Sequence, residues 1–223
     1  MGTQASSRYR DFVEWCKAGS RVLEIGCATG EFLAELSAGG YYTAGVEPSP
    51  ECAAEARKVC PEVYVGMMEE AEYPAESFDA ICMFHVLEHI ESPVDALRWI
   101  WGKIKPHGLL YLEVPDVRYP YLGNLSRFFQ TAHLWSFSLA TLKAILAKAG
   151  FAVVWSRPLV EGKFLRVIAR KEADIPEPSF PAHPWEDVQR NLRTWRWKWW
   201  LIYRWKQAVS RLIHAVKRRM MRA

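Results

Sequence analysis

The sequence has no apolar run of the roughly 20 residues that a membrane-spanning helix needs, and its first ten residues are polar. Its five cysteines form no CxxC pair, which argues against a zinc ribbon or a disulfide scaffold. It also lacks GxGxxG and GK[ST] strings, so neither a dinucleotide dehydrogenase nor a P-loop NTPase is indicated. We therefore expect a cytoplasmic chain with reduced thiols.

Charge is distributed unevenly along the 223 residues, although the net value is only +4. Residues 188–223 contain 11 Lys and Arg and no Asp or Glu, which leaves 18 basic and 25 acidic residues in the first 187. The sequence therefore predicts an acidic body followed by a strongly basic tail.

Short apolar segments alternate with helix-like segments in the first half of the chain. Strands are expected over 21–26, 42–47, 63–66, 78–85 and 108–115, and helices over 31–38, 50–59 and 93–104. Ser49 and Ser92 each precede a proline and an acidic first turn, as at helix starts. Strands separated by helices predict an α/β fold with a mostly parallel sheet covered on both faces.

The second half is organised differently. Residues 116–137 are aromatic and irregular and are expected to form a lid or substrate loop. A helix is expected over 138–149, then an antiparallel hairpin from strands 151–159 and 164–171. We divide the chain into a domain over 1–172, a proline-rich linker over 173–187 and a tryptophan-rich helical tail over 188–223.

The string VLEIGCATGEF at 22–32 places two glycines where a strand passes into a helix. Gly26 and Gly30 would let the backbone approach a ligand, and the helix start would supply unpaired N–H groups. The next strand ends in Glu47, where a carboxylate can accept hydrogen bonds from ribose hydroxyls. Together these features predict a nucleotide-type ligand.

Two later strings are AGVEPSPECAAEAR and SFDAICMFHVLEHIESPVDALRWIWGKIKPHGLLYLEVPD. Together with VLEIGCATGEF they resemble the class I S-adenosylmethionine-dependent methyltransferases of types 11 and 23, and the resemblance extends over about residues 8–171. The resemblance implies a Rossmann-like seven-stranded sheet in which the last hairpin reverses one strand. It also implies these cofactor-binding residues: Glu24, Gly26, Cys27, Ala28, Thr29, Gly30, Glu47, Pro48, Met67, Met68, Glu69, Phe84 and His85. S-adenosylmethionine would be the cofactor, with S-adenosylhomocysteine as product.

Three histidines are candidates for acid–base or positioning roles: His85, His89 and His133. With Glu88 they also have the ligand types of a divalent metal site. That set is similar to the ExxEH pattern of metal-dependent small-RNA 2′-O-methyltransferases and of ubiquinone-pathway O-methyltransferases, with His85 at the first Glu position. The same LEH string is common in methyltransferases without a metal, so both interpretations stay open, with metal not favoured.

The tail over 190–223 holds five of the 11 tryptophans and places apolar residues at helical spacing. A cationic helix with tryptophans is typical of an anionic membrane surface. Docking on the protein's own body or on a second copy in a dimer, and nucleic-acid binding, are the alternatives.

The acceptor is predicted less sharply than the cofactor. The stretch HLWSFSLATLKAILAKAGF is similar to bacterial methyltransferases of sugar, polysaccharide and lipid modification. We expect O-methylation of a saccharide or lipid-linked acceptor at the inner face of the membrane. Metal-assisted RNA 2′-O-methylation, an aromatic or quinone-like small-molecule acceptor, and a non-catalytic cofactor-binding module are the alternatives.

Overall fold

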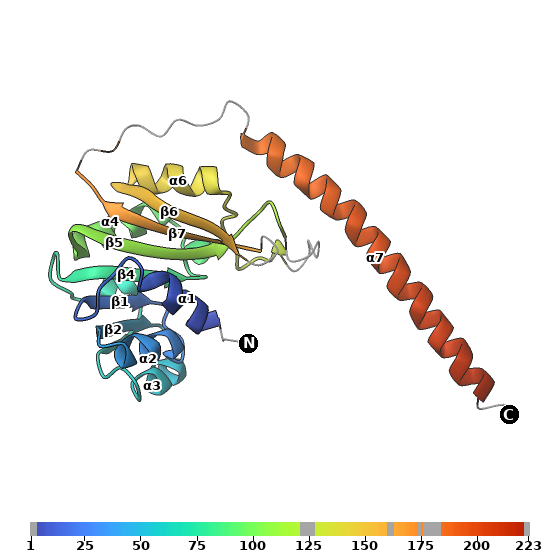
Figure 1. Ribbon diagram of the computed structural model, residues 1–223, viewed down its shortest axis with the longest axis horizontal. Helices are drawn as coiled ribbons and strands as arrows, with labels where there is room; N and C mark the ends of the chain where they lie inside the picture. Colours follow the sequence, from blue (N-terminus) through green and yellow to red (C-terminus); the bar gives the residue numbers. More distant parts are fainter. Residues whose placement is uncertain (1–3, 121–127, 160–162, 174, 176–183, 221–223) are drawn as a thin grey trace.

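A computed structural model describes residues 4–120, 128–159, 163–173, 175 and 184–220, without the side chains of residues 4, 159, 184, 187, 199 and 206–220. Helices and strands alternate along most of this chain (Figure 1). They are α1 (Gln4–Phe12), β1 (Arg21–Ile25), α2 (Glu31–Ala38), β2 (Tyr42–Glu47), α3 (Pro50–Ala56), β3 (Val63–Val65), the short 3-10 helix η1 (Met68–Glu70), β4 (Phe78–Phe84), the 3-10 helix η2 (Leu87–His89), α4 (Pro93–Lys103), β5 (Ile104–Pro115), α6 (Leu139–Lys148), β6 (Phe151–Leu159), β7 (Phe164–Lys171) and α7 (Pro184–Met220).

The seven strands form one sheet in the order β3-β2-β1-β4-β5-β7-β6. The first five run parallel, and β7 lies antiparallel between β5 and β6. The Rossmann-like seven-stranded sheet with one reversed strand is therefore confirmed. Successive strands are added outward in one direction from β1 to β3 and in the other direction from β4 to β5, so the order reverses between β1 and β4. In such sheets a ligand site lies at the carboxyl ends of the strands near that point.

Two apolar cores cover the two faces of the sheet. On one face, α4 and α6 pack Leu97, Ile100 and Leu142 against strand residues of β1, β4 and β5. On the other face, α1 and α2 contribute Phe12 and Phe32. Because both faces are covered, the central strands are buried along most of their length, which explains their near-continuous apolar sequence.

Local sequence signals explain where several helices begin. The Ser49 hydroxyl accepts a hydrogen bond from the N–H of Cys52, and Ser138 caps α6 through the N–H of Thr141. Ser92 precedes Pro93 at the start of α4, but its side chain makes no capping hydrogen bond there within the described residues. The helix starts at 50 and 93 are as predicted, and α6 begins one residue after the predicted start at 138, because Ser138 is its N-cap.

Other boundaries differ from the sequence prediction. The strand expected over 108–115 begins at Ile104, because Ile104 already pairs with Phe78 before the sheet register shifts. The helix expected over 50–59 ends at Ala56, where Arg57 turns its guanidinium to the carbonyl of Val63. The helix α1 was not predicted.

Several predicted features fall partly outside the described residues, namely 121–127 of the lid, 160–162 of the hairpin turn, 174 and 176–183 of the linker, and 221–223 of the tail. The five cysteines are free thiols. None of the helices among the described residues is long and apolar enough to cross a membrane.

Candidate active site

A cavity of about 1050 Å³ opens at the carboxyl ends of β1, β2 and β4. This volume is at the upper end of the range of about 300–1,000 Å³ that is typical of small-molecule sites. Its lining residues are Ile25, Gly26, Ala28, Val46, Glu47, Pro48, Gly66, Met67, Met68, Glu69, Phe84, His85, Val86, His89, Ile90, Glu91, Ser92, Asp95, Ala96, Trp99 and Leu134. Ten of the predicted site residues are among them.

The turn after β1 brings main chain to the cavity wall. Gly26 has φ +71°, and a Cβ placed on it would collide with the side chain of Val86. Ala28 also lies in the left-handed region, with φ 47°. This conformation costs a non-glycine residue on the order of 1–2 kcal/mol, and it directs the N–H of Ala28 toward Glu47 at the end of β2.

The Glu47 carboxylate is fixed by two main-chain donors. The Ala28 N–H donates to Oε2 at 2.9 Å, and the Ser49 N–H donates to Oε1 at 2.9 Å. A carboxylate has about four acceptor sites, so two remain after these bonds. Glu47 lines the cavity while only 9% of its surface is exposed, which makes it a pre-oriented acceptor for hydroxyl groups.

The segment after β3 contributes apolar side chains to the same cavity. Met67 is 56% exposed and Met68 is buried. The N–H of Met67 donates to Glu70 Oε2 at 2.9 Å, which fixes the turn into η1. Thioethers are polarisable and adaptable, so the two methionines suit an apolar contact with a flat ring.

Four predicted cofactor residues lie elsewhere. Cys27 packs in an apolar cluster against α3, and Thr29 is exposed. A Cβ on Gly30 would meet Ala56 in α3 at 3.0 Å, so this glycine is required by helix packing and not by approach to a ligand. Glu24 is buried within β1.

Glu24 has an unusual electrostatic environment. Its Oε2 is buried without a hydrogen-bond partner among the described residues. Burial raises the pKa of Glu24 to about 8; the positive charge of Arg8 opposes this rise and the negative charge of Glu47 adds to it. A glutamate in this position is therefore largely protonated at neutral pH.

His85 follows β4 and lies between two carboxylates. Its φ is 57°, and its Nε2 lies 2.9 Å from Glu113 Oε1 while Nδ1 lies 3.5 Å from Glu88 Oε1. Burial lowers the pKa of His85, but hydrogen bonds with Glu113 and Glu88 outweigh that effect and leave the pKa above its ordinary value. His85 is thus better suited to carry a positive charge beside the cavity than to accept a proton.

Glu113 in β5 is the centre of a buried group of charges. It accepts hydrogen bonds from Arg8 Nη2 at 2.6 Å and from Arg166 Nε, besides its contact with His85. Arg166 also donates to Asp11 Oδ2 at 2.7 Å, which fastens α1 to β7. Burial alone would raise the pKa of Glu113, but the bond with His85 and the two arginines together lower it below its ordinary range.

Sequence reasoning did not identify this group of charges. The available signal was a lone charge inside an apolar strand: Glu113 in LLYLEVP and Arg166 in FLRVIA. Such residues are rarely buried without a partner. Which charges meet could not be read from the sequence, because 53 residues separate this pair.

The later part of the predicted lid brings His133 to His89. The rings of His89 and His133 have centroids 5.0 Å apart. His89 Nδ1 lies 2.7 Å from the carbonyl oxygen of Ala132, and His133 Nδ1 lies 3.1 Å from that of Phe128. A carbonyl oxygen only accepts, so both Nδ1 atoms carry the proton and each Nε2 carries a lone pair. His133 Nε2 is 3.0 Å from Gln130 Nε2, an available donor.

Glu88 completes a cluster with these two histidines. One ligand atom of each of Glu88, His89 and His133 lies within 4.8 Å of the others. Glu88 is 1% exposed, and among the described residues its carboxylate has only the long 3.5 Å contact of Oε1 with His85 Nδ1, so Oε2 is without a partner there. The N–H of Trp135 donates to the Glu88 carbonyl at 3.1 Å, which holds the two segments together. Of four predicted metal ligands, three therefore meet, whereas His85 turns to Glu113.

Comparison with curated proteins finds methyltransferase relatives. A tRNA U34 carboxymethyltransferase of Hahella chejuensis is 29% identical over 172 residues, covering 68% of this chain and 53% of the relative. A mitochondrial ubiquinone biosynthesis O-methyltransferase of Schizosaccharomyces pombe is 31% identical over 106 residues, covering 44% of this chain and 38% of the relative. The chain thus spans about half the length of the first relative and less of the second.

Solved structures and a family profile agree with these relatives. The S-adenosylmethionine-dependent methyltransferase of Thermotoga maritima has a TM-score of 0.61 at 26% identity, covering 75% of this chain and 89% of that one. The profile of the methyltransferase domain family matches residues 1–156. The chain therefore belongs to the methyltransferase domain family and is a class I S-adenosylmethionine-dependent methyltransferase.

Proposed function

We propose that this methyltransferase modifies a hydroxyl oxygen of an acceptor with an apolar part, such as a lipid-linked or small ring-bearing molecule. The observation that carries the proposal is the placement of His89. It lines the cavity, and its Nδ1–H is held by the carbonyl of Ala132, which leaves the Nε2 lone pair as the proton acceptor. A hydroxyl must lose a proton during transfer and benefits from such a base.

The cavity residues fit S-adenosylmethionine. Glu47 offers acceptor sites for ribose hydroxyls, Gly26 permits close approach of the main chain, and Met67 and Met68 offer an apolar surface to the adenine. The cofactor, when bound, supplies a methyl group already activated on a sulfonium. The protein is then left with orienting the acceptor and taking up one proton.

The acceptor class is supported by the remaining lining residues. Val86, Ile90, Trp99 and Leu134 contribute apolar surface, which favours an acceptor with a ring or an acyl part. The Schizosaccharomyces pombe relative is named as an O-methyltransferase. A saccharide acceptor, expected from the sequence, has no counterpart in the names of the reported relatives.

RNA is the second candidate acceptor, because the Hahella chejuensis relative is named for a tRNA position. The lining of the cavity disfavours it. Glu69, Glu91 and Asp95 place three carboxylates there, and a polyanionic phosphate backbone is attracted by basic residues and repelled by acidic ones. A neutral acceptor meets no such repulsion.

A divalent metal is a second way to activate the hydroxyl. The residues fit one: Glu88 supplies a buried carboxylate, and His89 and His133 each donate Nδ1–H to a main-chain carbonyl, as metal-bound histidines commonly do. A metal bound there would act as a Lewis acid on the acceptor oxygen. His89 would then be a ligand and not a base.

The test uses methyl-labelled S-adenosylmethionine with the full chain, a cell extract, and separate catechol, lipid-linked sugar and tRNA acceptors. We expect label in a solvent-extractable product and a loss of at least about 100-fold in kcat for His89→Asn, which removes the base. The control is His107→Asn, because His107 is exposed. Label confined to tRNA would overturn the acceptor proposal.

The same assay distinguishes base from metal. If His89 is the base, a chelator leaves activity unchanged and His133→Gln lowers it much less than His89→Asn does. Three results together would assign the cluster to a metal instead. Activity would be lost with the chelator, the chain would bind Zn²⁺ or Mn²⁺ tightly, and the losses would be similar for Glu88→Gln, His89→Asn and His133→Gln.

A further inference from the structure

The helix α7 carries a large basic charge that methyl transfer does not require. It spans 37 residues, Pro184–Met220, and Figure 1 shows it running away from the sheet domain. From Val188 onward the chain has 11 Lys and Arg and no Asp or Glu. The body has the opposite sign, with 18 basic and 25 acidic residues in positions 1–187.

Helical geometry places many apolar positions of α7 on one side and its arginines on the other. The three lysines, Lys198, Lys206 and Lys217, fall on the apolar side, and Trp197, Trp200 and Leu201 fall among the arginines. At 100° per residue, eight apolar positions fall within an arc of about 120°: Val188, Leu192, Trp195, Trp199, Ile202, Val209, Ile213 and Val216. The arginine positions within the helix fall within an opposite arc of about 140°: Arg190, Arg193, Arg196, Arg204, Arg211, Arg218 and Arg219. We call these the apolar arc and the arginine arc.

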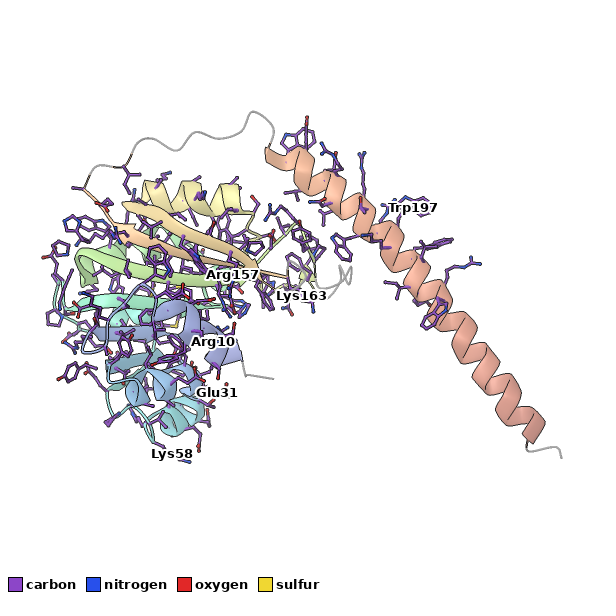
Figure 2. All side chains as sticks on the ribbon, in the orientation of Figure 1. Arg10, Glu31, Lys58, Arg157, Lys163 and Trp197 are labelled. Atoms are coloured by element: carbon purple, nitrogen blue, oxygen red, sulfur yellow. The ribbon has the colours of Figure 1, made fainter. Side chains whose placement is uncertain are left out.

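Aromatic side chains are exposed along the described part of α7. Trp197 is 66% exposed and Trp205 is 67% exposed, and Figure 2 shows Trp197 projecting from the helix. Basic groups lie over two other rings: Lys198 Nζ is 5.1 Å from the centroid of Trp195, and Arg204 Cζ is 5.1 Å from that of Trp200. Tryptophan has an apolar body and one polar N–H, so it favours the boundary between lipid and water.

We propose that α7 is a docking surface for an anionic lipid bilayer, on which it lies in the plane of the interface. The apolar arc would enter the headgroup boundary, and the basic residues would be attracted by the negative surface potential. The acidic body would be repelled by the same surface, so α7 would be the segment that brings the cavity to the membrane.

Two other partners fit α7 less well. RNA would be bound by the arginine arc through its phosphates, and the apolar arc would stay in water at a cost of roughly 25 cal/mol per Å². A coiled coil with a second copy would cover the apolar arc. It would also bring two helices with no acidic residue from Val188 onward side by side, whereas such pairs use opposite charges across their interface.

Vesicle co-sedimentation of the full chain tests the proposal. The probes are vesicles of phosphatidylcholine alone and of phosphatidylcholine with one-quarter phosphatidylglycerol, at low and high salt. Each basic residue near an anionic surface contributes about 1 kcal/mol, so Arg193→Gln/Arg204→Gln should weaken binding by about 30-fold. Trp195→Ser/Ile202→Ser should weaken it at least about 10-fold. The matched control on the same helix is Gln189→Ala/Thr194→Gln.

Binding to the anionic vesicles that both double variants lose and the control keeps would support the proposal. No binding to those vesicles would overturn it, as would binding that only the arginine variant weakens. In that case, RNA binding that the apolar-arc variant retains would identify RNA as the partner. A dimer that the apolar-arc variant no longer forms would identify a second copy of the chain as the partner. The readout needs no methyl transfer, so failure here is distinct from failure of the proposed acceptor; unchanged S-adenosylhomocysteine binding shows that each variant is folded.

Discussion

The two sides of the cavity are built by different means. On the side of β1 and β2, main-chain conformation places the groups: Gly26 and Ala28 have positive φ, and main-chain N–H groups orient Glu47. On the side of β4, β5 and β7, charged side chains do so, because His85 is held by Glu113, which is held in turn by Arg8 and Arg166. The first side depends on local sequence, and the second on contacts across the fold.

The difference predicts different responses to mutation. The side that depends on main-chain conformation is disturbed by a single added methyl group, and its conformation is almost independent of pH. A buried group of charges is disturbed by the loss of any one member, because the remaining charges stay buried without compensation.

Arg166→Met should have the largest effect on stability. It removes the cation that bonds Glu113 and Asp11 and leaves two buried carboxylates, which should cost about 3–5 kcal/mol of unfolding free energy. Urea denaturation at pH 7 measures this. Arg157→Met is the control: Arg157 also bonds Asp11 but its side chain is 47% exposed, so its loss should cost less than about 1 kcal/mol. Equal losses would mean that burial of the charges is not what matters.

The pH profile of the same pair tests the sign of this effect. The pKa of Glu113 is lowered by folding, so its stabilisation is present above the unfolded value near 4.5 and is lost as pH falls through the folded pKa. The unfolding free energy of the native chain should therefore fall below about pH 4.5. Arg166→Met should fall less steeply, because it has already lost part of what lowers that pKa.

Gly26→Ala should have the next largest effect. The new Cβ would collide with Val86, and alanine disfavours φ +71°, which together should cost about 2–3 kcal/mol of unfolding free energy. Adding Val86→Ala should recover only the part due to the collision. Gly102→Ala in α4 is the control of opposite sign: a Cβ there meets nothing within 4 Å, and alanine in a helix should add about 0.5–1 kcal/mol.

Glu47→Gln should weaken cofactor binding and should also cost about 1–3 kcal/mol of unfolding free energy, because the new amide nitrogen faces one of the two main-chain N–H donors. The amide replaces one carboxylate oxygen with a donor and removes a charge that accepts hydrogen bonds, which is worth about 1.5–3 kcal/mol, or about 10- to 100-fold in affinity. Calorimetric titration with S-adenosylhomocysteine measures the change. Glu51→Gln, at an exposed position in α3, should leave the affinity within about twofold. Unchanged binding in both would remove Glu47 from the cofactor site.

Glu24→Gln should change stability in the opposite direction, by stabilising the chain at high pH. The pKa of Glu24 is raised from 4.5 to about 8 in the folded state, mainly by burial. Ionisation of the unfolded chain therefore lowers the stability of the native protein as pH rises from 4.5 toward 8. The amide removes this penalty, so the variant should equal the native chain in stability at pH 4 and exceed it by about 4 kcal/mol at pH 8. Thermal unfolding of the variant and the native chain at pH 4 and pH 8 measures this difference in stability.

The cavity-lining residues that sequence reasoning found are those fixed by local pattern. Glu47 and His89 each follow or end a recognisable strand within a short motif, so their position at the sheet edge could be predicted. Their roles stay predictions until binding and turnover are measured. Gly30 belongs to the same motif, yet it is required by contact with Ala56, a packing fact that no motif contains.

Residues that act through distant partners could not be predicted from the sequence. Arg8 and Glu113 are 105 positions apart, and the tautomers of His89 and His133 depend on the carbonyls of Ala132 and Phe128. Neither relation is encoded in spacing, because both arise when α1 and the segment after residue 128 pack on the sheet.

The sequence by itself determined the alternation of strands and helices, the glycine turn at Gly26, the acid at Glu47 and the opposite charges of body and tail. Each of these follows from the periodicity, conformational freedom or charge of neighbouring residues. The tertiary structure alone decided that His85 pairs with Glu113 while Glu88, His89 and His133 meet. Hydrogen bonds and Coulomb forces act between groups that only the folded sheet brings within a few ångströms.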